Sequence, residues 1–171
     1  RQDFEVHLGD KDSQFTQLGV LSYFESIHRE SIEQATPPAI AVLTGSIVII
    51  PTVAKPRLEE LLGGNRLTYQ NVGQLSPDDF LKVRLVGSQH DLVTAVTHLF
   101  QEGLIQVVIG TKSLLGEGWD APCVNSLILA SFVGSFMLSN QMRGRAIRVW
   151  PEDPDKTSNI WHLVSINLSL K

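Results

Sequence analysis

The run IQVVIGTKSLLGEGWD, at residues 105–120, joins an apolar segment directly to a glycine-rich one. Its first five residues form a short apolar stretch rich in β-branched side chains, which is typical of a buried strand. Before it, apolar residues recur every three or four positions over residues 90–102 and predict a helix that ends at Gly103. The glycine-rich part, residues 110–120, therefore begins where a strand ends.

The alternation of strands and helices continues toward the C-terminus. Apolar strands are predicted at residues 125–131 and 159–166, and a helix at residues 136–147 for which Ser135 can act as the N-cap. Strands that are apolar throughout and separated by helices indicate a mainly parallel sheet covered on both faces. We therefore predict the α/β fold class.

The N-terminal half is predicted to hold a longer helix and several short elements. The helix ends near residue 33, Asp12 or Ser13 can cap it, and one apolar stripe runs along it: Phe15, Leu18, Leu21, Phe24 and Ile27. Two of the short elements are apolar strands, at residues 39–43 and 46–50, and a third is a short helix at residues 57–62 that Pro56 begins. The last is a two-stranded β-ribbon formed by residues 66–72 and 80–86. These short elements break the regular alternation of the second half.

Length and composition narrow the class of protein. A chain of 171 residues fits one domain, residues 1–171, and a hydrophobic content of 43% is ordinary for a globular α/β protein. The net charge of −4 excludes a protein that is basic all over, so any nucleic-acid contact must come from a local patch. No apolar run is long enough to span a membrane, and the chain begins without Met or a signal-peptide pattern, which indicates a fragment of a longer protein.

The cysteine and the histidines point to no metal site. The single cysteine, Cys123, has no partner for an internal disulfide, which favours a reducing cytoplasm, and beside Pro122 we predict it to be a small buried hydrophobic residue. The five histidines show no metal-ligand spacing with cysteine or acidic residues. We expect a cytoplasmic protein that binds neither a membrane nor, within this chain, a metal ion.

A second run, QMRGRAIR at residues 141–148, places three arginines within eight residues of an acidic chain. Each guanidinium offers five donors in a fixed fork and keeps its charge, so it suits an anion with several oxygens. A solvated basic helix face is the alternative. Because both runs follow strands of one predicted sheet, they are expected at its carboxyl edge, where α/β sheets bind ligands. The order of the two runs therefore favours a nucleotide site.

Neither run is a complete phosphate-binding loop. Residues 110–113, Gly-Thr-Lys-Ser, lack the glycine spacing of a P-loop, and no acidic pair after a strand is placed to hold Mg²⁺. A dinucleotide-binding loop at Gly116 and Gly118 is disfavoured, because Pro122 prevents a long helix from starting there. This chain alone therefore lacks the parts that cradle the β- and γ-phosphates.

Together, in this order and with a strand and a helix between them, the two runs resemble motifs V and VI of superfamily 2 helicases. The match is closest to bacterial DEAD/DEAH-type enzymes with Gly-Glu-Gly-Trp-Asp and Gln-x-x-Gly-Arg-x-x-Arg signatures, and it covers residues 88–166. The chain looks like the second of their two RecA-like domains, which implies a three-layer arrangement. Residues 39–87 look like an insertion that carries the β-ribbon, and the family's first strand, motif IV, is expected before Arg1.

The resemblance implies a role for each nucleotide-facing residue. ATP, with Mg²⁺, would be held mainly by an N-terminal RecA-like domain of the same chain, over which this domain closes. Arg145 and Arg148 would act as arginine fingers on the γ-phosphate, which makes them the candidate catalytic residues. Asp120 would accept hydrogen bonds from the ribose, Gly118 would allow close approach of the backbone, and Gln141 stands where many members have His or Gln.

The resemblance also implies a nucleic-acid contact. Thr111 and Lys112 would hold the backbone of DNA or RNA, with DNA preferred, and phosphate contacts of this kind carry no sequence information. The protein is therefore expected to be an ATP-dependent helicase or translocase, of which this fragment alone is inactive. Two alternatives stay open: a RecA-like module that binds nucleic acid or protein without hydrolysis, and the motor part of a restriction enzyme.

Overall fold

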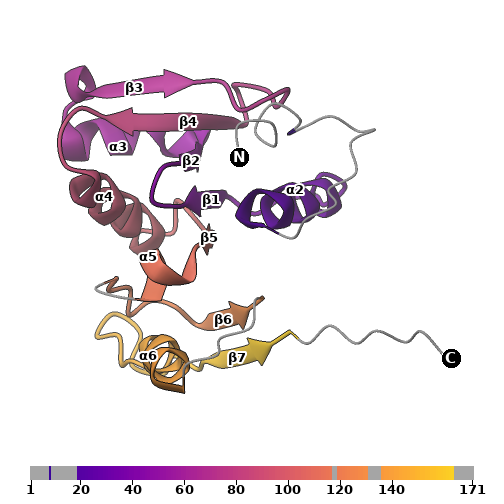
Figure 1. Ribbon diagram of the computed structural model, residues 1–171, viewed down its shortest axis with the longest axis vertical. Coiled ribbons are helices and arrows are strands. Elements are labelled where there is room, and N and C mark those ends of the chain that lie inside the picture. Colours follow the sequence, from indigo (N-terminus) through magenta and orange to yellow (C-terminus); the bar gives the residue numbers. More distant parts are fainter. Residues whose placement is uncertain (1–7, 9–18, 117–118, 131–135, 164–171) are drawn as a thin grey trace, which may run out of the picture. The chain divides into compact units, whose positions relative to one another are not determined.

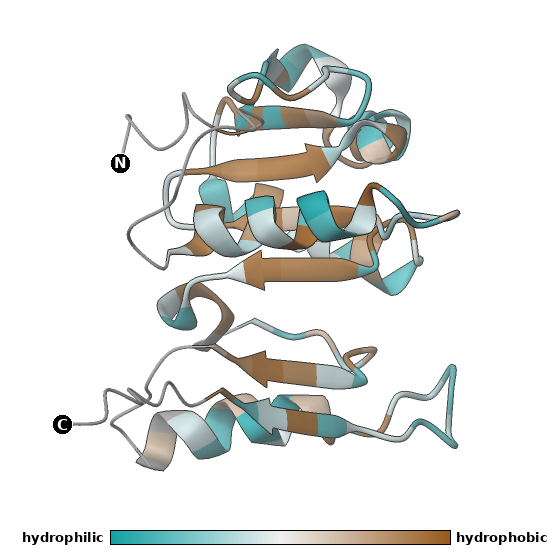
Figure 2. Cartoon of the chain, turned by 90° about the vertical axis from the view of Figure 1, so that its right-hand side faces the viewer, coloured by the Kyte–Doolittle hydropathy of each residue, from teal (hydrophilic) through white to brown (hydrophobic). Residues whose placement is uncertain are grey.

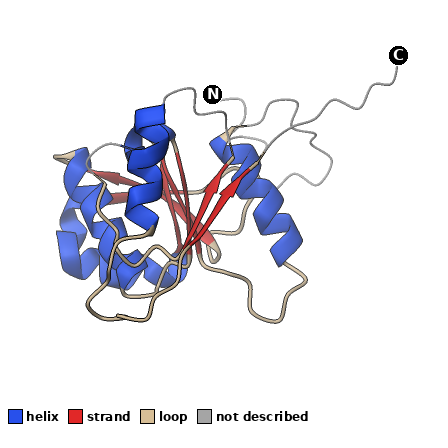
Figure 3. Cartoon of the chain, turned by 90° about the horizontal axis from the view of Figure 1, so that it is seen from below, coloured by secondary structure: helices blue, strands red, loops and turns tan. Residues whose placement is uncertain are grey.

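The computed structural model describes residue 8 and residues 19–116, 119–130 and 136–163 (Figure 1). The chain divides into two compact units, residues 1–114 and residues 115–171. Helices and strands alternate with loops in both (Figure 3), so the chain is a mixed α/β protein. No helix in the described ranges has both the length and the apolar composition needed to cross a membrane.

The first unit is built on a sheet with the strand order β3-β4-β2-β1-β5. Its strands are β1 (Ile40–Leu43), β2 (Val48–Pro51), β3 (Leu67–Gln70), β4 (Phe80–Leu85) and β5 (Val107–Gly110). Only β1 and β5 pair in parallel, whereas β1 with β2, β2 with β4 and β3 with β4 pair antiparallel. The sheet is therefore mixed and mostly antiparallel, and the prediction of a mainly parallel sheet is wrong for this unit.

A tight turn explains the antiparallel pairing of β1 with β2. The Thr44 Oγ1 atom accepts a hydrogen bond from the main-chain nitrogen of Ile47 at 2.9 Å, and the Thr44 nitrogen donates to the Ile47 oxygen at 2.9 Å. Such a short connection can join only antiparallel neighbours, since a parallel pair needs a crossover of a dozen or more residues. The crossover between β1 and β5 is the long segment that contains β2 to β4.

The predicted β-ribbon exists, but it is part of the main sheet. β3 and β4 pair in the register Leu67 with Leu85 and Gln70 with Lys82, and β4 in turn pairs with β2. The segment that we interpreted as an insertion, residues 39–87, supplies four of the five strands. It is therefore the larger part of this sheet rather than an addition to it.

Three α-helices lie in the described part of the first unit; the sequence predicts the bounds of two of them to within two residues, whereas the third begins later than predicted. They are α2 (Val20–Ser31), α3 (Lys55–Leu62) and α4 (Gln89–Gln101), and two single 3₁₀ turns, Thr52–Ala54 and Gly64–Arg66, flank α3. The Ser88 hydroxyl accepts a hydrogen bond from the main-chain nitrogen of His90 and caps α4. α4 is followed by Gly103, whose φ of 78° is a left-handed value that glycine adopts easily. α2 begins at Val20 with Gly19 at its N-cap position, later than predicted, and the predicted caps Asp12 and Ser13 lie outside the described residues.

One cluster of core residues of the first unit lies between α2 and one face of the sheet. The central strands β1 and β2 are mostly hydrophobic (Figure 2), and both are buried at every position. Phe24 of α2 is fully buried and meets the ring of Phe80 edge to face, with 5.0 Å between ring centroids. Of the predicted apolar stripe, Phe24 is thus a core residue and Leu21 packs at its margin, whereas Ile27 is 37% exposed.

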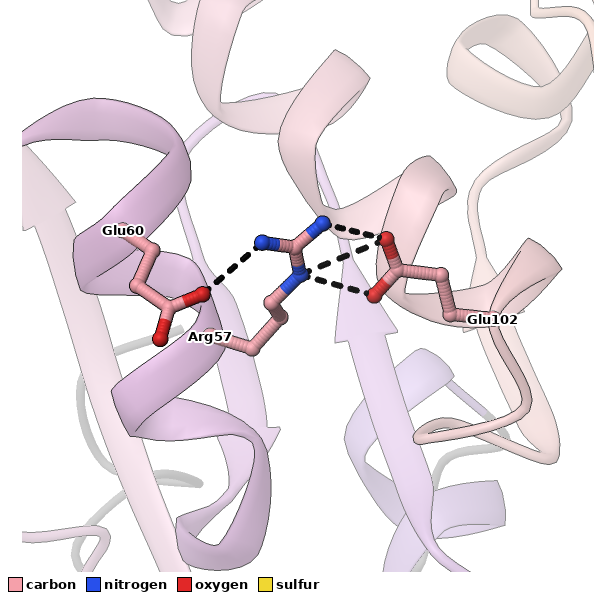
Figure 4. Close-up of polar contacts among 3 residues, drawn as sticks. All are labelled: Arg57, Glu60 and Glu102. Carbon is pink, nitrogen blue, oxygen red and sulfur yellow. Dashed lines mark hydrogen bonds and ion pairs between the residues drawn. The ribbon is translucent and has the colours of Figure 1, made fainter.

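An arginine on α3 links this helix to the end of α4 (Figure 4). The Arg57 guanidinium donates to both carboxylate oxygens of Glu102, at 2.8 and 3.0 Å, and to Glu60 at 2.8 Å. These hydrogen bonds hold the pKa of the Glu102 carboxyl below its usual range and raise the pKa of Arg57. The three side chains are between 37% and 65% exposed, so solvent screens the attraction between them.

The second unit holds a parallel strand pair and one helix. β6 (Ser126–Leu129) pairs with β7 (Asn159–His162) in the predicted parallel sense, and α6 (Phe136–Ala146) lies between them in the sequence. Leu129 of β6 and Met142 and Ala146 of α6 are buried, as are Ala121 and Val124 in the segment before β6. The short helix α5 (Lys112–Gly116) spans the boundary between the two units. The predicted cap Ser135 and the strand residues after 163 lie outside the described residues.

Candidate functional site

Arg145 lies near the end of α6 and turns toward the segment that precedes β6. Its Nη1 atom donates to the main-chain oxygen of Leu115 at 3.0 Å and to that of Trp119. The side chain is partly buried, and this loss of solvent, with the nearby charge of Arg148, lowers its pKa, while Asp120 opposes the shift. Arg145 is therefore held against residues 115–119 by its own hydrogen bonds.

Arg148 follows the end of α6 and forms an ion pair with Asp120. Its Nη1 atom contacts the Oδ1 atom of the carboxylate. The side chains of Arg148 and Asp120 are 53% and 66% exposed. An ion pair exposed to this degree adds little to stability, so its partners can exchange for a ligand at small cost.

The two sequence runs therefore meet in the second unit. Asp120, Arg145 and Arg148, which we call the arginine site, come from segments some 25 residues apart, and hydrogen bonds join them across that gap. The site presents two guanidinium groups and one carboxylate. Guanidinium forks bind phosphate oxygens, and a carboxylate accepts hydrogen bonds from hydroxyl groups. This donor set fits a ligand that carries both phosphate and hydroxyl groups.

The other residues predicted to contact the nucleotide make no described contact with the arginine site. Gln141 is exposed on α6, four residues before Arg145 and hence on the same side of the helix. Arg143, the additional arginine of the run, is also exposed but lies two residues from Arg145, on another side. Gly118 lies outside the described residues. The structure thus brings together three of the five residues predicted to contact the nucleotide.

Thr111 and Lys112, the predicted nucleic-acid contacts, lie in the first unit at the end of β5. The main-chain nitrogen of Thr111 donates to the Leu43 oxygen at 3.3 Å, and Lys112 is exposed at the start of α5. Because Leu43 pairs with Gly110, the carboxyl ends of β1 and β5 meet at one edge of the sheet. The turn that follows β1 exposes Gly45 and Ser46 beside this edge, and no sequence motif marks them as a binding site.

Two further residues of the second unit were not selected from the sequence. Lys156 donates to three main-chain oxygens, and Ser158 donates to one of the same three. Because its acceptors are main-chain oxygens, which every residue has, no sequence pattern identifies Lys156 in advance. Both residues contact segments that adjoin the arginine site.

Cys123 is half-buried rather than fully buried as predicted. Burial raises the pKa of its thiol, and the nearby charge of Lys156 lowers it by less. The thiol is therefore protonated at neutral pH and is a poor nucleophile.

In the described part of the chain, no cluster of three or more His, Cys, Asp or Glu side chains is arranged to hold a metal ion. No protein-family model, curated protein or solved structure matches the chain. The geometry of the arginine site is therefore the observation on which a function rests.

Proposed function

We propose that this chain is the second RecA-like motor domain of a superfamily 2 helicase or translocase of the DEAD/DEAH type. The observation that carries the proposal is the arginine site, in which Arg145 and Arg148 lie against the run that ends in Asp120. Hydrogen bonds of Arg145 and Arg148 bring the arginine run into contact with the glycine-rich run. Their contact is what a composite nucleotide site requires.

The proposed RecA-like fold draws support from the parallel strand pairs. β1 with β5 and β6 with β7 are parallel, and each glycine-rich or arginine-rich run follows a strand of one of these pairs. Ligands of α/β sheets bind beyond the carboxyl ends of parallel strands. The antiparallel strands β2, β3 and β4 then form an extension of the sheet on the side of β1 away from β5.

The proposed mechanism assigns transition-state charge to the two arginines. ATP would be bound mainly by an N-terminal RecA-like domain of the full-length protein, with Mg²⁺ in that domain, and this domain would close over it. Arg148 and Arg145 would then exchange their present acceptors for oxygens of the transferred phosphoryl group, whose charge they offset. Asp120, released from Arg148, would accept hydrogen bonds from the ribose hydroxyls.

The proposal that ATP is bound mainly by another domain gives the first test. Residues 1–171 alone should not hydrolyse ATP, because no P-loop lies among them, whereas the full-length protein should hydrolyse ATP faster when single-stranded nucleic acid is added. Phosphate release with and without an oligonucleotide measures both. Stimulated hydrolysis by residues 1–171 alone, or an unstimulated full-length protein, would contradict the proposal.

The nucleic-acid contact at the end of β5 gives a second prediction. Residues 1–171 should bind oligonucleotides without sequence preference, with a dissociation constant of roughly 10⁻⁴ to 10⁻⁶ M at physiological salt. Lys112→Ala should make the slope of log affinity against log salt shallower by about 0.7 on a single strand, since one phosphate contact is lost. Fluorescence anisotropy across a salt series measures the slope.

A matched variant controls for the loss of a positive charge elsewhere. Lys55 also lies in the first unit, but its ammonium group is paired with Glu59 at 3.9 Å and lies over the Tyr69 ring, 4.7 Å from the ring centroid. Lys55→Ala should therefore leave the salt slope unchanged. Equal slopes for Lys112→Ala and the unmodified chain would place the nucleic-acid surface elsewhere.

One observation favours a second candidate function, a RecA-like module that binds without hydrolysis. The guanidinium of Arg145 is already bonded to the oxygens of Leu115 and Trp119, which is also how a purely structural arginine would be held. The two functions differ in what the loss of this arginine does to the turnover of ATP.

A further inference from the structure

Lys156 lies in the second unit, between the end of α6 and the start of β7, and its ammonium group is bonded to three main-chain oxygens. The Nζ atom is 2.7 Å from the oxygen of Pro122, 2.8 Å from that of Val124 and 2.9 Å from that of Ala146. A lysine ammonium has three donors and no acceptor. All three donors are therefore used within the chain, so Lys156 is not placed to bind a phosphate or a nucleic acid.

The three acceptors belong to two segments that are distant in sequence. Pro122 and Val124 lie in the turn before β6, whereas Ala146 is the last residue of α6. The final carbonyl groups of a helix lack partners within it, and a positive charge near them is favourable. The Ser158 hydroxyl donates to the same Ala146 oxygen. Lys156 is thus both a cap for α6 and a cross-link from α6 to the turn.

Both ends of this cross-link adjoin the arginine site. Pro122 is two residues after Asp120, and Ala146 directly follows Arg145 and is two residues before Arg148. Because these carbonyl groups are fixed, the backbone of Asp120 and of Arg148, only two residues away, has little freedom to move. A displacement of either segment would therefore alter the separation of Asp120 and Arg148.

We propose that Lys156 is a positioning residue, which sets the separation of Asp120 and Arg148 by tying the turn at residues 122–124 to the end of α6. The role of Lys156 in setting this separation depends only on the structure of this chain, whereas its effect on ATP turnover rests on the proposed function. A displacement of about 1 Å at a reacting group can reduce a rate by about 10²-fold, so the cross-link matters to hydrolysis without contacting ATP.

The direct test measures the Arg148 side chain by NMR in the 171-residue chain. Asp120→Asn, which removes the charge of the ion-pair partner, gives the Nε–H signal of an Arg148 without a charged partner. Lys156→Met keeps the apolar stem and removes the three donors, and it should move the Arg148 signal toward the Asp120→Asn position. Adding Lys156→Met to Asp120→Asn should then move it little further.

Two variants keep this test decisive. Lys156→Arg retains the charge, but a planar guanidinium cannot direct three donors at three converging oxygens. It should therefore shift the Arg148 signal in the same direction, and it replaces Lys156→Met in the test if that variant does not fold. Ser158→Ala removes one uncharged hydrogen bond to the same acceptor and should shift it less. An Arg148 signal that is unchanged in folded Lys156→Met or Lys156→Arg overturns the proposal.

Kinetics of the full-length protein then separate this proposal from the proposed function. Lys156→Met should lower kcat for ATP by about 10-fold to 10²-fold, with KM for ATP and affinity for an oligonucleotide within twofold of the unmodified protein. Lys55→Met, a lysine change in the other unit, should leave kcat unchanged. If the Arg148 signal moves but the unmodified full-length protein has no ATPase activity, the positioning role stands and the helicase function fails. A moved signal with normal kcat overturns the link to turnover.

Discussion

Replacement of Arg148 by alanine should lower kcat for nucleic-acid-stimulated ATP hydrolysis in the full-length protein by roughly 10³-fold to 10⁵-fold, the range observed for arginine fingers. The folded protein should lose almost no stability, because the Arg148 side chain is 53% exposed and its ion pair with Asp120 is screened by solvent. Steady-state phosphate release gives kcat, and thermal unfolding followed by circular dichroism gives the midpoint Tm.

The control for Arg148→Ala is another exposed arginine of the same run. Arg143→Ala removes an equal charge two residues before Arg145 and should change kcat far less. Arg148→Lys should restore only part of the activity, since an ammonium cannot reproduce the forked geometry of a guanidinium. If Arg148→Ala turned over ATP at the rate of the unmodified protein, the finger role would have to be abandoned.

Replacement of Arg145 by alanine should reduce both kcat and stability. The guanidinium supports the segment before β6 through the oxygens of Leu115 and Trp119, and those oxygens lose their charged donor in the variant. Hydrogen bonds to charged groups contribute about 1.5–3 kcal/mol, and partial exposure reduces this to about 1–2 kcal/mol. We expect a lower Tm by several degrees, together with a loss of kcat comparable to that of Arg148→Ala.

The pair of Arg145 measurements separates the two candidate functions. A motor domain predicts that kcat falls by much more than the fraction of protein unfolded at the assay temperature. A module that binds without hydrolysis predicts a lower Tm in a full-length protein that has no stimulated ATPase activity in the first place. A full-length enzyme in which Arg145→Ala lowers Tm but leaves kcat intact would show that only the structural role of Arg145 is real.

The elements of the fold could be predicted from local signals, but the direction of the strands could not. Gly63 and Gly103 mark the ends of α3 and α4, where their positive φ values of 79° and 78° are easy for glycine. The apolar runs of β1 and β2 correctly indicate burial on both faces. Burial on both faces is a property of central strands whether their neighbours are parallel or antiparallel, so the runs carried no information on direction. The turn at Thr44 decides it, through hydrogen bonds that the sequence alone did not reveal.

The candidate site shows the same limit at the level of single side chains. The order of the two runs, with a strand between them, predicted that they would lie at one site, and Arg145 and Arg148 do contact the segment that ends in Asp120. The present acceptors of Arg145 are main-chain oxygens, as are those of Lys156, and every residue has such an oxygen. Their choice depends on how the chain folds around them, which a pattern of residue types does not encode.

The contact of Arg57 with Glu102 also has a consequence for acid tolerance. A carboxyl whose pKa is lowered in the folded state contributes stability that is fully present above its unfolded pKa and is lost only as the pH falls through the lower, folded value. Glu102 therefore stays ionised under mild acid, where glutamates without such a partner begin to take up protons. α3 should remain attached to the end of α4 under those conditions, so mild acidification of the first unit should act first at acidic groups other than Glu102.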